Sequence, residues 1–282
     1  MDKRNEEAVN ETASGSGAEP QEPSASAEPL TQENAAPDSF VEATREIAHK
    51  AAELRSTRAA ELSRTAFRLV LGSHSPRRRQ LLADSGYRFA TLPSDDGVEE
   101  KAERSELEDA EPRKLTLFLA FYKAQNVAGR LLNNPEERER IAQEFNAGET
   151  SPFVVLGCDS VAVCKGEVMG KPKDRADAER MLRKLSGSLH AVHTGVCLWR
   201  VDPLGNVLER VLQRVETSVL KMDPLSESQL MEYLDSGKWS GKAGAFGYQD
   251  GNDWLKLNLG TESNVVGLPL EALAEMVPDM VD

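Results

Sequence analysis

The stretch Leu69–Arg79 constrains the fold most, because its residues read as a strand, a tight turn and the start of a helix. The apolar run Leu69–Leu71 is typical of a buried strand, and Gly72 ends it. Ser75 stands where a helix N-cap belongs, and Pro76 takes the first helical position. The sequence therefore predicts a strand–turn–helix unit at this point of the chain.

The start of that helix is a candidate anion-binding site. Free backbone N–H groups and the positive end of the helix dipole lie there, and Arg77, Arg78 and Arg79 follow directly. A polyanion such as a triphosphate would suit this combination. Arginines on a helix surface are more often simply solvated, so both interpretations stay open on this stretch alone.

The composition argues against a broad nucleic-acid-binding or membrane-binding surface. The 282 residues carry a formal net charge of -13, whereas such surfaces are basic. No apolar run approaches the roughly 20 residues of a membrane-spanning helix, and the polar, acidic N-terminus does not resemble a signal peptide. The three cysteines, Cys158, Cys164 and Cys197, have no zinc-binding spacing, so we expect a reduced chain in the cytoplasm.

Three segments are expected along the chain. Residues 1–38 are rich in Glu, Ala, Ser and Pro and contain almost no bulky apolar residue, so they predict a disordered acidic tail. Residues 39–65 are rich in Ala, Glu and Arg and predict a helix that serves as a linker or as a partner-binding segment. The folded domain is expected over residues 66–282, with a polar surface insertion at 133–152 that holds a short helix.

Other candidate chemical groups follow other predicted elements. Asp159 comes just after the apolar run Phe153–Leu156, where a carboxylate would face the ligand crevice of an open α/β sheet, although a capping role is an alternative. Glu99 and Glu100 follow a turn, and Lys171 follows a predicted hairpin. The glycine-rich stretch 237–251 would let the backbone approach a ligand closely, or would be only a flexible connector.

Taken together, these segments resemble the Maf family of nucleoside triphosphate pyrophosphatases, in the family's order and near its spacings. The resemblance covers residues 68–278 and rests on Ser73–Arg79, Cys158–Ser160, Gly170–Pro172, Leu185–Gly187 with His190, Thr194–Gly195, Lys242–Gln249 and Asn264–Leu270.

The resemblance implies an elongated, two-lobed α/β fold of the Maf/ITPase-like kind, with a mixed twisted sheet and a central cleft. It implies hydrolysis of a nucleoside triphosphate to the monophosphate and pyrophosphate, with a divalent cation (Mg²⁺ or Mn²⁺) and in a homodimer. Such enzymes remove non-standard nucleotides and have been linked with arrest of septum formation. A nucleotide-binding regulator of cell division without turnover is the alternative.

The resemblance also assigns catalytic roles residue by residue. Asp159 is the expected proton acceptor, and Asp159 and Glu100 are the expected metal ligands. Lys171 matches the lysine of the family's Gly-Lys-Pro motif and is the third expected catalytic residue. Because the loop before Glu100 is two residues longer here than in the family, Glu99 is a rival for its role.

The substrate-binding residues are expected in three places. Ser75, Arg77 and Arg78 match the family's Ser-Pro-Arg-Arg segment, and Lys242 is expected to help hold the phosphates. An Arg, a Thr and a Gln mark the dTTP/UTP type of the family, and Arg77, Ser160 and Gln249 stand at these positions. Serine keeps the hydroxyl of threonine, so we expect Ser160 and Gln249 to bond to the edge of a pyrimidine base.

Overall fold

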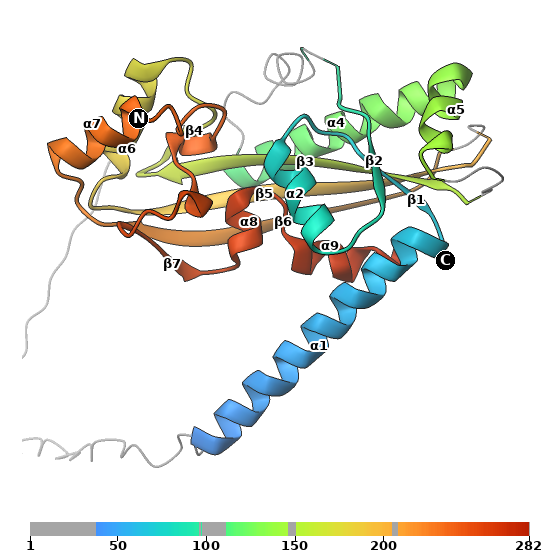
Figure 1. The fold of residues 1–282 in the computed structure, drawn as a ribbon, viewed down its shortest axis with the longest axis horizontal. Coiled ribbons are helices and arrows are strands. Elements are labelled where there is room, and N and C mark those ends of the chain that lie inside the picture. Colours follow the sequence, from blue (N-terminus) through green and yellow to red (C-terminus); the bar gives the residue numbers. More distant parts are fainter. Residues whose placement is uncertain (1–37, 96, 98–110, 146–150, 205–207, 282) are drawn as a thin grey trace, which may run out of the picture. The chain divides into compact units, whose positions relative to one another are not determined.

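The computed structural model describes residues 38–95, 97, 111–145, 151–204 and 208–281 (Figure 1). The chain divides into two compact units, Met1–Thr44 and Arg45–Asp282. Helix α1, Asp38–Thr65, crosses this boundary and confirms the helix predicted before the folded domain. The tail predicted over residues 1–38 and the residues Glu99 and Glu100 lie outside the described part, apart from Asp38.

A seven-stranded mixed sheet forms the second unit, as predicted for the α/β class (Figure 1). Its order is β2-β1-β3-β5-β6-β7, and β4 pairs with β3 beside this path. Strand β1 runs parallel to β2 and β3, and the other pairs are antiparallel. The strands are β1 Arg68–Leu71, β2 Phe89–Thr91, β3 Phe153–Cys164, β4 Glu167–Met169, β5 Leu189–Val201, β6 Leu208–Met222 and β7 Leu255–Leu259.

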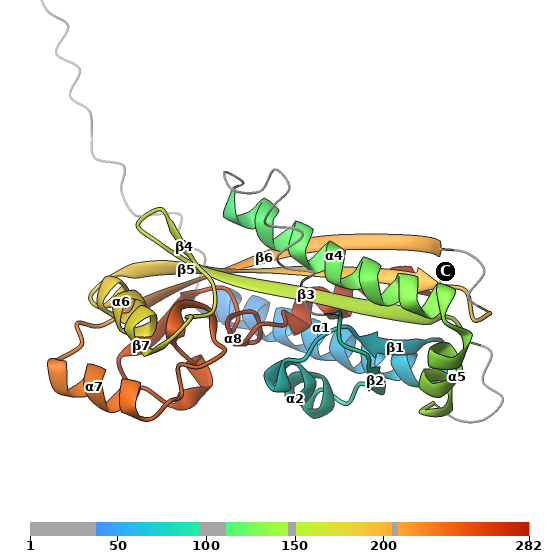
Figure 2. The same ribbon diagram turned by 90° about the horizontal axis from the view of Figure 1, so that it is seen from above.

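The two faces of β3 carry different packing partners because successive side chains point to opposite sides of a strand. Phe153 and Val155 pack in one cluster with residues of α4, which lies along β3 and β5 (Figure 2). Val154 and Leu156 pack in another cluster with residues of α1, α2 and α9. The remaining helices are α2 Pro76–Asp84, α4 Pro112–Asn133, α5 Pro135–Gln143, α6 Arg175–Leu185, α7 Glu227–Asp235, α8 Glu262–Val266 and α9 Leu270–Met276. No helix in the described part of the chain is long and apolar enough to cross a membrane.

Two sequence-based predictions about β3 and its surroundings are corrected. The apolar run that begins at Phe153 was expected to end near Gly157, but β3 continues through Asp159 to Cys164, because β5 pairs with it along almost this whole length. The segment 133–152 was expected as a surface insertion, but Ile141 and Phe145 are fully buried in the core cluster beneath α4. The many charged residues of α5 made this segment look like surface, so the sequence pattern did not indicate that these two side chains are buried.

Helix α4 approaches the sheet at two glycines. A Cβ atom at Gly157 of β3 would lie 2.3 Å from the carbonyl oxygen of Ala120, and one at Gly195 of β5 would lie 2.3 Å from that of Thr116. Both contacts are with main chain, which cannot rotate out of the way. The absence of side chains at these two sites therefore sets the distance between α4 and the sheet.

Gly157→Ala is expected to lower the free energy of unfolding by about 1–3 kcal/mol, because overpacking forces the helix away from the strand. Urea unfolding monitored by circular dichroism measures this. Gly129→Ala is the matched control, since a Cβ there meets nothing within 4 Å and alanine favours a helix. A Gly157→Ala protein as stable as the wild type would contradict the close approach.

His190 makes the stability of the fold depend on pH. The side chain is buried at the start of β5, with its ring 5.1 Å from that of Phe246, and burial lowers its pKa from 6.5 to about 4. The unfolded chain then binds more protons between these values, so stability is complete above pH 6.5 and falls as the pH drops toward 4. His190→Phe is expected to remove about 3 kcal/mol of this dependence. Equal pH slopes of the unfolding free energy in the two proteins would contradict it.

Candidate functional site

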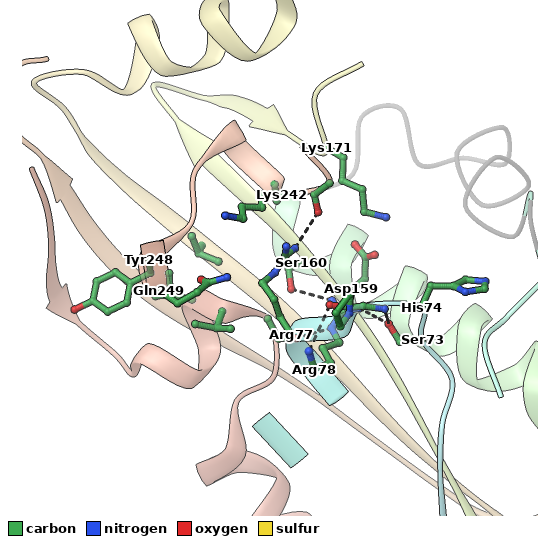
Figure 3. Close-up of a pocket in the computed structure, with 18 of the residues that line it drawn as sticks. Ser73, His74, Arg77, Arg78, Asp159, Ser160, Lys171, Lys242, Tyr248 and Gln249 are labelled. Carbon is green, nitrogen blue, oxygen red and sulfur yellow. Dashed lines mark hydrogen bonds between the residues drawn. The ribbon is translucent and has the colours of Figure 1, made fainter. Parts of the chain in front are cut away.

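The candidate site lies where β3 continues past the end of its neighbouring strand β1. Strand β1 pairs with β3 only as far as Leu71 and Leu156, and β4 pairs with β3 only from Ala162 onward. Between these points no strand of the described residues pairs with this edge of β3, and Asp159 and Ser160 lie there. A cavity of about 420 Å³ lies against this opening (Figure 3).

Eight of the nine predicted site residues line this single cavity. They come from the loop before α2 and its first turn, from β3, from the loop after β4 and from the glycine-rich stretch (Figure 3). The residues are Ser75, Arg77, Arg78, Asp159, Ser160, Lys171, Lys242 and Gln249. The ninth, Glu100, and its rival Glu99 lie outside the described residues, so their placement in the site stays a prediction.

The first turn of α2 brings Arg77 and Arg78 to the cavity and turns Arg79 away from it. Ser75 is the N-cap, as predicted, and its side chain accepts a hydrogen bond from the backbone N–H of Arg78. Arg77 is half-buried beside the cavity and donates to the carbonyl oxygen of Gly241 at 2.9 Å. Burial and the neighbouring Arg78 lower the pKa of Arg77, and the negative charge of Asp250 opposes this shift. Arg79 is exposed and lies outside the cavity lining.

Arg78 holds the walls of the cavity together. Its buried guanidinium donates to the carbonyl oxygen of Gly267 at 2.7 Å, to Ser73 Oγ at 3.0 Å and to Ser160 Oγ at 3.2 Å. These bonds connect α2, the preceding loop, β3 and the end of α8. The resemblance predicts a substrate contact for Arg78, and the structure adds a scaffold role that the sequence does not reveal.

Asp159 forms a buried ion pair with a lysine that the sequence analysis did not select. Lys123 Nζ of α4 lies 2.5 Å from Asp159 Oδ1, and the two side chains are only 7% and 12% exposed. A signal was available in the sequence, because Lys123 interrupts the apolar face that Ala120, Ala124 and Val127 form on α4. A lysine on the buried face of an amphipathic helix calls for a partner of opposite charge.

Lys242 also has a carboxylate partner. Its Nζ donates to Asp250 Oδ1 and Oδ2 at 2.7 and 2.5 Å, and Tyr233 Oη donates to Asp250 Oδ2 at 2.7 Å. Burial lowers the pKa of Lys242, and Asp250 opposes this shift. Lys242 was expected to hold phosphates, but this charge is largely balanced within the glycine-rich stretch. Asp250 and Tyr233 were not predicted.

Lys171 and Gln249 are exposed at the cavity, on opposite sides of Arg77 and Ser160 (Figure 3). A metal ion would meet one predicted ligand here, Asp159, because Glu100 is not described. Among the described residues, no group of three or more His, Cys, Asp and Glu side chains could hold a metal ion. A single carboxylate does suit Mg²⁺, which commonly keeps several waters and takes further oxygen ligands from substrate phosphates.

The fold and the site define an α/β protein with a cavity that cationic side chains, the N-terminus of α2 and the buried carboxylate of Asp159 line together. Residues 68–280 match the family described as Maf-like protein, and the chain belongs to this family.

Curated relatives carry one recurring name. The dTTP/UTP pyrophosphatase of Rhodopirellula baltica is 44% identical over 211 residues, which cover 74% of this chain and 80% of the relative. The dTTP/UTP pyrophosphatase of Acetivibrio thermocellus is 37% identical over 75% of this chain and 94% of its own length. A human protein named as a probable bifunctional dTTP/UTP pyrophosphatase/methyltransferase is 36% identical over 72% of this chain and 30% of its own length.

Asp250→Asn is expected to lower the free energy of unfolding by about 3 kcal/mol, because it leaves the buried Lys242 ammonium without its carboxylate. Chemical denaturation measures the change. Asp253→Asn removes an exposed carboxylate from the same stretch and should change stability by less than about 0.5 kcal/mol. The double variant Lys242→Met/Asp250→Asn should regain part of the loss, and no regain would show that the pair is not its source.

Proposed function

We propose that this chain hydrolyses dTTP and UTP to the nucleoside monophosphate and pyrophosphate, by attack of a water molecule on the α-phosphate. Membership of the Maf family and the shared name of the relatives support the broader class, a nucleoside triphosphate pyrophosphatase. The observation that carries the proposal is one cavity in which Arg77 and Lys171 lie with the carboxylate of Asp159.

The phosphates would bind at the cationic side of the cavity. The N-terminus of α2 offers backbone N–H groups and a positive dipole end to an anion, and Arg77 and Lys171 add positive charge at the same cavity. Phosphoryl transfer depends mainly on positioning and on electrostatic stabilisation of the charge that develops on the phosphate oxygens. The negative charge of the triphosphate would also oppose the burial and the Arg78 charge that lower the pKa of Arg77.

Asp159 is the proposed proton acceptor. Lys123 bonds to its Oδ1, which fixes the carboxylate at this edge of β3, and the carboxylate would take the proton of the attacking water. The same carboxylate would hold Mg²⁺ or Mn²⁺, and Glu100 is the proposed second ligand. When bound, such an ion supplies positive charge to the phosphates and polarises water.

The base would lie along the apolar part of the cavity. Val192, Phe246 and Val265 line this part, and Ser160 and Gln249 line the cavity with them. Flat apolar walls suit the faces of a pyrimidine, and the hydroxyl and amide suit its polar edge. A homodimer and a cytoplasmic location, which the family resemblance implies, stay predictions.

Pyrophosphate release from dTTP and UTP in the presence of Mg²⁺ tests the proposal. Asp159→Asn should lower kcat by about 10²–10⁴-fold, since it removes the proton acceptor and a metal ligand together. Asp84→Asn, in an exposed position at the end of α2 and outside the cavity lining, should leave kcat unchanged. Nucleotide binding by the wild type without pyrophosphate release would instead support a regulator without turnover.

A further inference from the structure

A chain of hydrogen bonds runs from Arg78 into the sheet beneath the cavity. Arg78 Nη2 lies 3.2 Å from Ser160 Oγ, Ser160 Oγ lies 2.9 Å from Thr194 Oγ1, and Thr194 Oγ1 lies 3.0 Å from the carbonyl oxygen of Asn264. Ser160 and Thr194 are directly opposite each other on β3 and β5. The two hydroxyls therefore connect a cation at one end to a carbonyl at the other.

The two ends of this chain fix the direction of every bond in it. A guanidinium can only donate and a carbonyl can only accept, whereas each hydroxyl has one proton and two lone pairs. Thr194 must donate its proton to the carbonyl oxygen of Asn264. In the contact between the two hydroxyls, Ser160 must therefore be the donor and Thr194 the acceptor. Ser160 accepts from Arg78, donates to Thr194 and keeps one lone pair for the cavity that it lines.

The surroundings of Thr194 prevent its hydroxyl from reorienting. Thr194 is fully buried and Asn264 is 1% exposed, so water does not compete for these bonds. The side-chain amide of Asn264 donates to Ser218 Oγ at 2.8 Å and to the carbonyl oxygen of Val192 at 3.3 Å. These bonds hold the start of α8 against β5 and β6, and with it the carbonyl that receives the proton of Thr194.

We propose that Thr194 is a positioning residue that makes the Ser160 hydroxyl a pure acceptor toward the cavity. This inference rests on the proposed function. Uracil and thymine carry a hydrogen on ring nitrogen N3, which such an acceptor can bind. Cytosine has an unprotonated N3, so its lone pair would meet the lone pair of Ser160. The hydroxyl chain thereby selects UTP and dTTP over CTP, although Thr194 itself does not touch the nucleotide.

Steady-state kinetics with UTP and CTP tests the role of Thr194. Thr194→Val keeps the shape of the side chain but gives Ser160 no acceptor, so the serine proton can turn toward the cavity. The ratio of kcat/KM for UTP to that for CTP is expected to fall about tenfold, the size of one hydrogen bond, as UTP turnover decreases and CTP turnover increases. Thr194→Ser keeps the hydroxyl and should keep the ratio. Thr217→Val removes a hydroxyl that bonds to His193 outside the cavity lining and should also keep it.

An unchanged ratio in Thr194→Val, or an equal loss for both nucleotides, would overturn the inference, because a purely structural role lowers both rates alike. If Thr194→Val does not fold, calorimetric binding of UMP and CMP to the wild type and to Ser160→Ala decides. The wild type should bind UMP more tightly and Ser160→Ala should lose this preference, and any other pattern rejects the inference. A wild type that releases no pyrophosphate contradicts the proposed function separately, since UMP and CMP binding to the wild type and to Thr194→Val still reports on the role of Thr194.

Discussion

The unequal length of two paired strands is the constraint on which the site depends. Strand β1 stops at Leu71 while β3 continues to Cys164, so in the described part of the chain the middle of β3 has an edge without a strand beside it. Backbone and side chains there face a cavity instead of another strand. The loop that leaves β1 is at the same place, and it delivers Ser75 and the first turn of α2 to the cavity. A single strand end therefore produces both the opening and one of its walls.

The alternation of side chains along β3 divides the chemistry between the two faces of the sheet. Asp159 points to the side of α4, where it bonds to Lys123. Ser160, the next residue, points to the other side, where Arg78 and Thr194 hold it. The proposed proton acceptor and the proposed base-binding hydroxyl need different surroundings. Two consecutive positions of one strand supply both, because each of them belongs to a different layer of the protein.

Much of the fold and of the candidate site could be predicted from the sequence, and the features that were missed depend on contacts that form only in the folded chain. The strand Leu69–Leu71 and the Ser75 cap are local features, and local patterns predicted them. The length of β3 was missed because the polar residues Asp159 and Ser160 resemble the end of a strand. Their place inside β3 becomes clear only when β1 is seen to end before them. Lys123 was missed although it interrupts the apolar face of α4, because nothing in the sequence identifies Asp159 as its partner. Asp250 was missed because its pairing with Lys242 lies in an irregular stretch without a helical or strand period. Thr194 belongs to a motif that was noticed, but its hydrogen bonds exist only in three dimensions.

The two glycines beneath α4 have a consequence for how the site tolerates change. Main chain rests directly on main chain at Gly157 and Gly195, so these two contacts fix the distance of the helix from the strands. Lys123 extends from this helix toward Asp159. Over evolutionary time the exposed residues of α4 can therefore change in size while the separation between ammonium and carboxylate stays constant, whereas a larger residue at the buried Ala124 would push the helix away from Gly157.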